Sequence, residues 1–395
     1  MGSESFNEDN GEPRVSDVSH LNDSRPRFRA DQVGSLLRPQ EIRDARNNPL
    51  VSREQLREIE DRHILRALQR QKDLGFKIFT DGELRRSQFM GDFYESVDGL
   101  DNDGSIARAW TGQSASGSAG GVALAPPTGL VVDKIRQKKR LTKHEADFLA
   151  RHAPGDVKMT LPTANQFPAI AYRQGLSERA YATYSDFLWD IVPIIKSEIQ
   201  ALVNEGVTYI QIDAPRYSYY LDPKWREYIR KEMGVSPDDA LDEAIRVDNA
   251  CLEGVQNEGV TLAIHLCRGN SRSRWYAEGG YDPIAEKLFN LLNVQLFLLE
   301  YESDRAGTFE PLRFVPRDKG IVLGLISTKL PELEAQDSLL RRIDAASRYI
   351  PLDNLALSPQ CGFASSLEGN LLTEDEQWQK LQLVTDTARK VWNTT

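Results

Sequence analysis

Segments with the pattern of buried strands alternate with amphipathic helical segments from Phe28 to Trp392, and this alternation constrains the fold most. Such an alternation predicts a parallel sheet whose crossover connections are helices. One large α/β barrel would use eight strands of this kind. The sequence offers nine candidates, at residues 28–37, 76–83, 130–135, 157–164, 207–215, 261–264, 294–300, 321–329 and 355–361.

Polar side chains gather at the carboxyl ends of these strand candidates. They are Ser35, Glu83, Asp213, His265, Cys267, Glu300, Lys329 and Cys361. In a (β/α)8 TIM barrel all of these strand ends share one face, which is the active face. An open doubly wound sheet would spread them along a line and would usually carry a Gly-rich phosphate-binding turn, which the sequence lacks. The sequence therefore predicts the barrel.

The barrel is predicted to occupy residues 27–395 as a single domain. Residues 1–26 are polar and acidic, and we expect them to be disordered. Residues 101–128 include a Gly/Ser-rich run and are expected to form a flexible insertion, either a lid, an oligomer contact or plain disorder. Ser52 is expected to cap one helix, and Thr142 with Glu145 to form a capping box at another.

Charge and composition exclude several kinds of partner. The net charge of −10 argues against nucleic acid or an anionic membrane as the main partner. No apolar run approaches the roughly 20 residues of a membrane span, and the N-terminus does not resemble a signal peptide. The three cysteines are too few for a disulfide framework. A cytoplasmic location, where thiols stay reduced and free to bind metal, is therefore expected.

A metal site is predicted where the strand at 261–264 ends. His265 and Cys267 lie two residues apart, so on an extended chain both side chains leave the same face. This pair alone is equally compatible with ordinary core packing. Glu300 and Cys361, at two later strand ends, complete a set of four acceptable zinc ligands. Two thiolates favour zinc over magnesium or calcium. The third cysteine, Cys251, lies on an apolar helix face and is expected in the core.

Six motifs in order resemble the catalytic C-terminal barrel of the cobalamin-independent methionine synthase family. They are Val33-Gly34-Ser35, Gly82-Glu83, Gln211-Ile212-Asp213-Ala214-Pro215, His265-Leu266-Cys267, Glu300 and Pro359-Gln360-Cys361-Gly362. The resemblance covers residues 28–392 and lacks the family's N-terminal barrel. The chain thus resembles a short, single-barrel member, with an architecture that uroporphyrinogen decarboxylases share.

The resemblance implies zinc-dependent methylation of a thiol. By motif match, His265, Cys267, Glu300 and Cys361 would bind Zn²⁺. A homocysteine-like amino acid would be held by the residues from Val33 through Gly34 to Ser35, together with Glu83 and Asp213. Methyl-tetrahydrofolate would be the possible co-substrate, methionine the product, and a homo-oligomer a possible assembly.

The residues that should bind the alkyl donor depart from the family pattern. The family's Asp-Glu-Pro reads Asp213-Ala214-Pro215, and its folate-contacting acid falls at about Tyr219. Lys329 is the nearest match to its general acid, and Phe167 to its aromatic folate platform. Three alternatives therefore stay open: a transferase that uses another thiol or donor, such as an epoxide; a non-catalytic barrel stabilised by zinc; and a decarboxylase-like barrel without zinc.

Overall fold

The central sheet of the computed structural model consists of parallel strands in the order β1-β6-β7-β8-β9-β10-β11, seven within the described residues. These described residues are 25–101, 104, 106, 108–111, 121–123, 129–255 and 259–395. The strands are β1 (Ile78–Phe79), β6 (Asp156–Pro162), β7 (Tyr209–Asp213), β8 (Thr261–Leu266), β9 (Leu296–Glu300), β10 (Gly320–Ile326) and β11 (Leu355–Pro359).

The eighth position is taken by the segment that begins at Phe28. Ala30 forms a parallel bridge with Leu357 of β11, and the Leu36 N–H donates to the carbonyl of Gly82 just beyond β1. The segment therefore joins the two ends of the strand order, and the predicted (β/α)8 barrel is confirmed. Its regular pairing is limited to that single bridge, so the strand predicted at 28–37 is shorter than expected.

The ninth strand candidate, residues 130–135, lies outside the barrel. It belongs to β5 (Leu130–Gln137), which pairs antiparallel with β2 (Val97–Asp101) in a separate ribbon. Its burial pattern alternates only in part, because one face of this ribbon meets solvent. The surplus strand of the sequence count is thus part of an insertion between β1 and β6.

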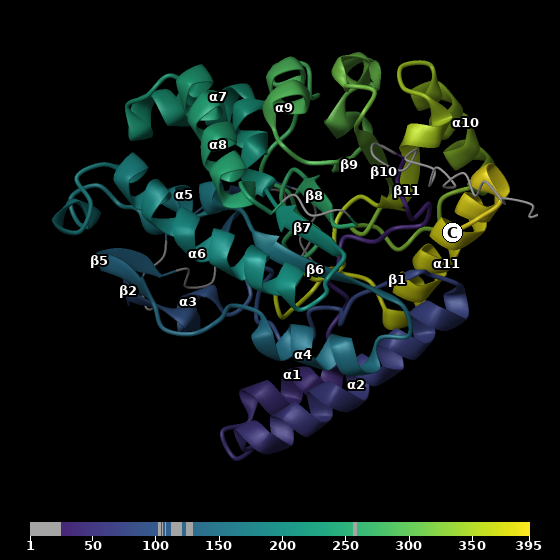
Figure 1. The fold of residues 1–395 in the computed structure, drawn as a ribbon, viewed down its shortest axis with the longest axis horizontal. Coiled ribbons are helices and arrows are strands. Elements are labelled where there is room, and N and C mark those ends of the chain that lie inside the picture. Colours follow the sequence, from purple (N-terminus) through teal and green to yellow (C-terminus); the bar gives the residue numbers. More distant parts are fainter. Residues whose placement is uncertain are drawn as a thin grey trace, which may run out of the picture.

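Helices surround the strands, as Figure 1 shows. The longer helices are α1 (Gln40–Asn47), α2 (Arg53–Leu74), α4 (Lys143–His152), α6 (Tyr184–Asn204), α8 (Pro237–Leu252), α9 (Ala285–Leu291), α10 (Gln336–Ser347) and α11 (Glu374–Trp392). Shorter helical pieces lie in the loops: α3 (Phe93–Ser96), α5 (Pro168–Ala171), α7 (Pro223–Tyr228), the 3₁₀ turns η1 (Ala164–Gln166), η2 (Ser177–Arg179), η3 (Pro215–Tyr220), η5 (Asp304–Ala306), η6 (Glu310–Phe314) and η7 (Leu352–Asn354), and the π-helical turn η4 (Ile229–Met233). None of the described helices is long and apolar enough to cross a membrane.

The apolar core has two layers. An inner cluster fills the barrel and includes Phe28, Ile78, Tyr209 and Leu298. An outer and larger cluster lies between strands and helices, and it contains Cys251 of α8, as predicted. Successive side chains of a barrel strand point alternately inward, to the inner cluster, and outward, to the outer cluster. Both faces of the strands are therefore buried, which is the expected arrangement for a parallel barrel.

One of the two predicted helix caps is confirmed. Ser52 caps α2 and forms a capping box with Gln55. The capping box predicted for Thr142 and Glu145 is wrong, because the Thr142 hydroxyl donates to Glu198 instead. The Glu145 carboxylate is drawn to Arg86, with which it forms a buried ion pair at 2.6 Å.

The insertion predicted at 101–128 contributes a covering element near the mouth of the barrel. Within its described part, β3 (Arg108–Trp110) pairs antiparallel with β4 (Gly121–Ala123), and Thr111 bridges Trp275 in the loop after β8. The Gly/Ser-rich run at 114–120 and the predicted tail up to residue 24 lie outside the described residues. Their roles as lid and tail stay predictions.

Candidate active site

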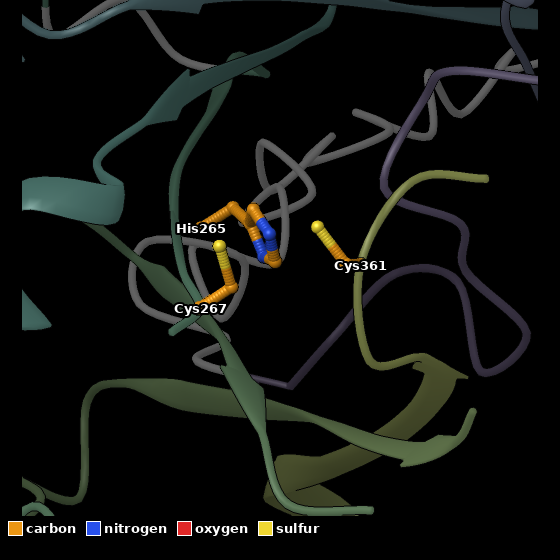
Figure 2. A group of neighbouring side chains, drawn as sticks. All are labelled: His265, Cys267 and Cys361. Atoms are coloured by element: carbon orange, nitrogen blue, oxygen red, sulfur yellow. The ribbon is translucent and has the colours of Figure 1, made fainter. Parts of the chain in front are cut away.

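Three predicted metal ligands converge at the carboxyl ends of two strands. His265 lies in β8 and Cys267 directly follows it, so the spacing of two residues turns both side chains to the same side. Cys361 follows β11 and faces this pair from the opposite side, as Figure 2 shows. One donor atom from each residue lies within 4.8 Å of the other two. The three side chains are buried, which is typical of a built site rather than a surface cluster.

The chemistry of this cluster fits a zinc ion. Neither ring nitrogen of His265 has a hydrogen-bond partner of normal geometry among the described residues, although both are buried. Buried polar atoms without partners are rare, because each costs its desolvation free energy. An imidazole with free nitrogens beside two thiols is a suitable donor set for a soft or borderline cation.

The three side chains also perturb one another's protonation. A hydrogen bond with Cys361 lowers the pKa of the Cys267 thiol well below its usual value, against the effect of burial. Burial lowers the pKa of His265, but the neighbouring Cys267 raises it overall. The protein therefore favours a thiolate at Cys267, which is the form that binds metal.

Glu300, the fourth predicted ligand, is held apart from this cluster. Its Oε1 accepts hydrogen bonds from Arg305 Nε at 3.1 Å and Nη2 at 2.9 Å. Its Oε2 accepts from the Arg268 N–H at 2.8 Å. The group of described residues that could hold a metal ion contains only His265, Cys267 and Cys361. The role of Glu300 as a ligand stays a prediction.

The predicted binding residues for the amino-acid thiol lie against the same cavity. Val33, Ser35, Glu83 and Asp213 line it together with the cluster, and its volume is ≈ 100 Å³. Asp213 is the register partner of His265 on the neighbouring strand. The structure thus brings the thiol half of the predicted site together.

Gly34 and Glu83 approach each other so closely that the first must be glycine. Gly34 has φ +141°, and a Cβ there would lie 2.9 Å from Thr160 Cγ2 and 3.0 Å from Glu83 Oε1. Glu83 itself has φ +54°, a left-handed conformation that non-glycine residues rarely adopt. Strain of this kind clusters at functional sites, where the surrounding structure enforces it.

Glu83, a buried carboxylate in this cavity, lacks a full set of hydrogen-bond partners. Glu83 Oε1 accepts a hydrogen bond from Thr160 Oγ1 at 2.9 Å, while its Oε2 has no hydrogen-bond partner among the described residues. Burial raises the pKa of Glu83, and it raises the pKa of Asp213 to about 7. A cation placed between these groups would lower both pKa values, so the pair is suited to bind an ammonium group.

The residues predicted for the donor side lie apart from the cavity lining. Lys329 is buried, and its ammonium donates to the Gly269 carbonyl and to Asn270 Oδ1, both at 2.9 Å. Tyr219 stacks on Trp225, with ring centroids 4.1 Å apart. Phe167 packs on Phe93 at 3.9 Å in the outer core. Among the described residues, none of these three side chains borders the cavity.

A largely neutral wall faces the cluster, and sequence reasoning missed its residues. Phe89, Met90, Trp110, Ile170 and Tyr276 supply its apolar part. These residues come from loops and from the insertion, where no periodic pattern marks a side chain as part of a site. Only their position in segments that follow barrel strands, as for Tyr276 in the loop after β8, could have indicated them.

The fold and the site together define a (β/α)8 barrel with a buried imidazole–thiol centre on its active face. Residues 170–389 match the family model "Cobalamin-independent synthase, Catalytic domain". The chain therefore belongs to the cobalamin-independent methionine synthase family, whose members are transferases.

Individual relatives support this assignment over most of the chain. A protein described as uncharacterized, YxjH of Bacillus subtilis, is 37% identical over 383 residues, which are 92% of this chain and 95% of that protein. The crystal structure of a putative vitamin-B12 independent methionine synthase from Listeria monocytogenes matches with a TM-score of 0.68 and 28% identity, covering 92% of this chain and 98% of that one. A B12-independent methionine synthase from Shewanella sp. W3-18-1, solved in complex with selenomethionine, shares the fold at 19% identity, with a TM-score of 0.71 and coverage of 92% and 98%.

Proposed function

We propose that the chain is a zinc-dependent thiol S-methyltransferase that methylates homocysteine or a closely related amino-acid thiol. The observation that carries this proposal is one cavity lined both by the His265–Cys267–Cys361 cluster and by the buried carboxylates Glu83 and Asp213. A structural zinc would need the cluster but would have no use for the two carboxylates. A non-catalytic, zinc-stabilised barrel explains the site less well for that reason.

Zinc bound by His265, Cys267 and Cys361 would lower the pKa of a substrate thiol, which is otherwise near 8.5, and so supply a thiolate at neutral pH. Glu83 and Asp213 bind the ammonium group of the amino acid. Backbone N–H groups near Ser35 bind its carboxylate, beside Gly34, whose close approach to Glu83 leaves no space for a side chain. These contacts hold the thiol against the cluster, and burial excludes water from it.

Methyl-tetrahydrofolate is the expected methyl donor, because the chain belongs to the cobalamin-independent methionine synthase family. The methyl group passes from nitrogen to sulfur, so the leaving nitrogen keeps the bonding electron pair and takes up a proton. Lys329 is the predicted acid, and it would have to release Gly269 and Asn270 to reach the donor. Phe89, Trp110 and Tyr276, rather than Phe167, form the aromatic part of the wall against which a donor would lie.

A second candidate keeps the thiol half and changes the donor. The wall opposite the cluster is apolar or neutral, and the lining contains no lysine or arginine among the described residues. A polyglutamylated folate carries several carboxylates, for which such a wall supplies no partner. This observation favours a compact, uncharged alkyl donor as the alternative.

The two candidates are separated by one assay. Zinc-loaded protein and homocysteine are incubated with methyl-tetrahydrofolate as mono- and triglutamate, and methionine is measured by mass spectrometry. Methionine formation that depends on the donor supports the first candidate. Stoichiometric zinc and a thiol-dependent change in the zinc-edge X-ray absorption spectrum without methionine support the second.

Matched variants assign the activity to the site. Cys361→Ser is expected to lose zinc and activity, whereas Cys251→Ala, which removes a thiol from the core of α8, should retain both. Asp213→Asn should retain zinc but raise the KM for the thiol. Zinc content that is equal in Cys361→Ser and the wild type would contradict the proposal.

A further inference from the structure

Arg216 carries a buried positive charge that the protein does not balance. It lies in η3, directly after Pro215, and only 2% of its surface is exposed. None of its three guanidinium nitrogens has a hydrogen-bond acceptor of normal geometry among the described residues. No carboxylate of the described residues forms an ion pair with it either. Arginine is almost never buried without a partner, because removing its charge from water is costly.

The surroundings of Arg216 are aromatic and neutral. Its guanidinium carbon lies 4.4 Å from the ring centroid of Tyr219 and 5.8 Å from that of Tyr276. The charge of Arg216 acts on the hydroxyls of five tyrosines, Tyr94, Tyr219, Tyr220, Tyr228 and Tyr276. Burial raises the pKa of each hydroxyl, so all five are neutral at pH 7. The Tyr219 hydroxyl is near enough to interact with the guanidinium but cannot compensate a full charge. Contacts with ring faces offset only part of the cost of burial.

A small cavity is lined by Arg216 and by a second residue that carries an unsatisfied donor, Asn165. Its volume is ≈ 20 Å³, enough for one water-sized group, and its lining includes Asn165, Arg216 and Tyr219. Nδ2 of Asn165 is buried and has no hydrogen-bond partner among the described residues. Two residues with unsatisfied donors, one of them charged, therefore line the same small space.

The small cavity continues toward a larger groove of ≈ 780 Å³. Pro168, Ala169, Tyr184 and Met233 line both spaces. Met233 belongs to the π-helical turn η4, and such turns occur frequently at functional sites. A ligand could thus place one small group beside Arg216 while the rest of it lies in the groove.

We propose that Arg216 and Asn165 bind one oxygen of the carboxylate or small oxyanion group of a ligand whose remainder occupies the adjoining groove. Glu178, Glu232 and Glu243 line this groove with a single arginine, Arg173. The remainder of the ligand is therefore uncharged or basic, and ligands with several anionic groups are disfavoured.

This site lies behind the wall of the catalytic cavity and is distinct from it. Pro215 and Gln166 line the catalytic cavity, whereas their chain neighbours Arg216 and Asn165 line the small one. The hydroxyl of Tyr276, which also lines the catalytic cavity, donates to the Pro215 carbonyl at 3.0 Å. The anion site does not depend on the proposed methyl transfer.

Anion binding is tested by thermal unfolding and by crystallography on the full chain. Bromide, acetate and inorganic phosphate are each titrated at constant ionic strength, and crystals are soaked in bromide for anomalous scattering. The wild type should show a saturable rise in Tm with at least one of these anions, and a bromide peak beside the guanidinium. Acetate and phosphate distinguish a carboxylate site from a site for inorganic oxyanions.

Variants show whether Arg216 is responsible. In Arg216→Met the anion-dependent rise in Tm should be lost, with binding at least tenfold weaker. Arg230→Met, which removes an exposed arginine paired with Glu227, should respond like the wild type. A response that is equal in Arg216→Met and the wild type, or bromide crystals without a peak at this position, would overturn the proposal.

Asn165→Asp tests the same idea without removing the arginine. The new carboxylate would neutralise Arg216 from within the protein. The Tm without added anion should then rise above that of the wild type, and the anion response should disappear. A lower Tm together with an unchanged anion response would show that Arg216 does not need a counterion.

Discussion

The side-chain amide of Gln211 donates a hydrogen bond to Oδ1 of Asp213, 2.8 Å away on the same strand. Gln211 Nε2 also donates to the Val33 carbonyl at 2.7 Å, and Gln211 Oε1 accepts from the Lys158 ammonium at 3.0 Å. The ammonium fixes the orientation of the amide, because only the oxygen of the amide can accept from it. Gln211 therefore positions two parts of the proposed thiol site from inside the barrel.

Gln211→Leu is expected to raise the KM for the thiol by roughly tenfold, which corresponds to the loss of about one hydrogen bond to a charged group. The zinc content should stay equal to that of the wild type, because Gln211 does not contact the cluster. Steady-state kinetics and metal analysis check both values. A variant that loses zinc and thiol binding together would indicate general disruption of the barrel instead.

Lys158 and Asp31 form a buried ion pair beneath this amide, at 2.5 Å. Lys158→Met should destabilise the protein by about 3–5 kcal/mol, because Asp31 is left as an unpaired buried charge. In the wild type the Tyr209 hydroxyl donates to Asp31 Oδ2 at 2.7 Å. Adding Asp31→Asn should recover most of the lost stability, since the new amide is neutral and its oxygen can still accept from Tyr209. Urea unfolding of both variants measures the coupling, and equal destabilisation of the single and double variants would contradict it.

The barrel fold and the place of the metal cluster could be predicted from the sequence because both follow from the periodicity of strands and helices along the chain. His265 and Cys267 are two residues apart on a strand, so their side chains point to the same face. The carboxyl ends of the parallel strands lie on one face of the barrel, so Cys361 lies close to both. The sequence could not show which of the nine strand candidates lies outside the barrel, since the β-branched pattern of residues 130–135 does not reveal which partner the strand pairs with.

The donor side could not be predicted for a different reason. Trp110 comes from the insertion and Phe89 and Met90 from a loop, so that tertiary contacts alone bring them to the cavity. Glu300 ends β9 as expected, but Arg305, five residues later, turns back to bind its carboxylate. Side-chain pairing of this kind leaves no periodic signal in the sequence.

Trp110→Ala should raise the KM for the alkyl donor by about tenfold while the KM for the thiol changes little. The indole packs edge-on against Tyr276, with ring centroids 5.1 Å apart, in the wall that faces the cluster. Loss of a buried aromatic contact of this kind is worth about 1 kcal/mol beyond the area it buries. Two-substrate kinetics separate the two constants, and an effect confined to the thiol would place the donor elsewhere.

Glu300→Gln should lower the affinity for zinc less than Cys361→Ser does. Its carboxylate is engaged by Arg305 and by the Arg268 N–H, while the three other predicted ligands already converge. Three protein ligands with one open position are the usual arrangement of catalytic zinc. Competition with a coloured chelator measures the affinities. A loss in Glu300→Gln as large as in Cys361→Ser would show that Glu300 is a ligand, as the family resemblance predicts.

Asp248 gives the stability of the protein a pH dependence away from the active site. It is fully buried in α8, its Oδ2 accepts from the Tyr217 hydroxyl at 2.9 Å, and burial raises its pKa to about 7. The folded protein therefore keeps a proton on Asp248 between about pH 4 and pH 7, where the unfolded chain has released it. This contribution to stability is fully present below pH 4 and is lost as the pH rises through 7.

Asp248→Asn should remove this dependence, because the amide is neutral at every pH and its oxygen still accepts from Tyr217. The variant should match the wild type near pH 4 and become more stable than it by a few kcal/mol near pH 8, since a pKa shift of one unit is worth about 1.4 kcal/mol. Urea unfolding of both proteins from pH 4 to pH 8 measures the difference. Asp242→Asn, which removes an exposed carboxylate from the same helix, is the control and should leave the pH profile of the wild type unchanged. A stability difference between Asp248→Asn and the wild type that stays constant over this range would mean that Asp248 is ionised in the folded protein throughout.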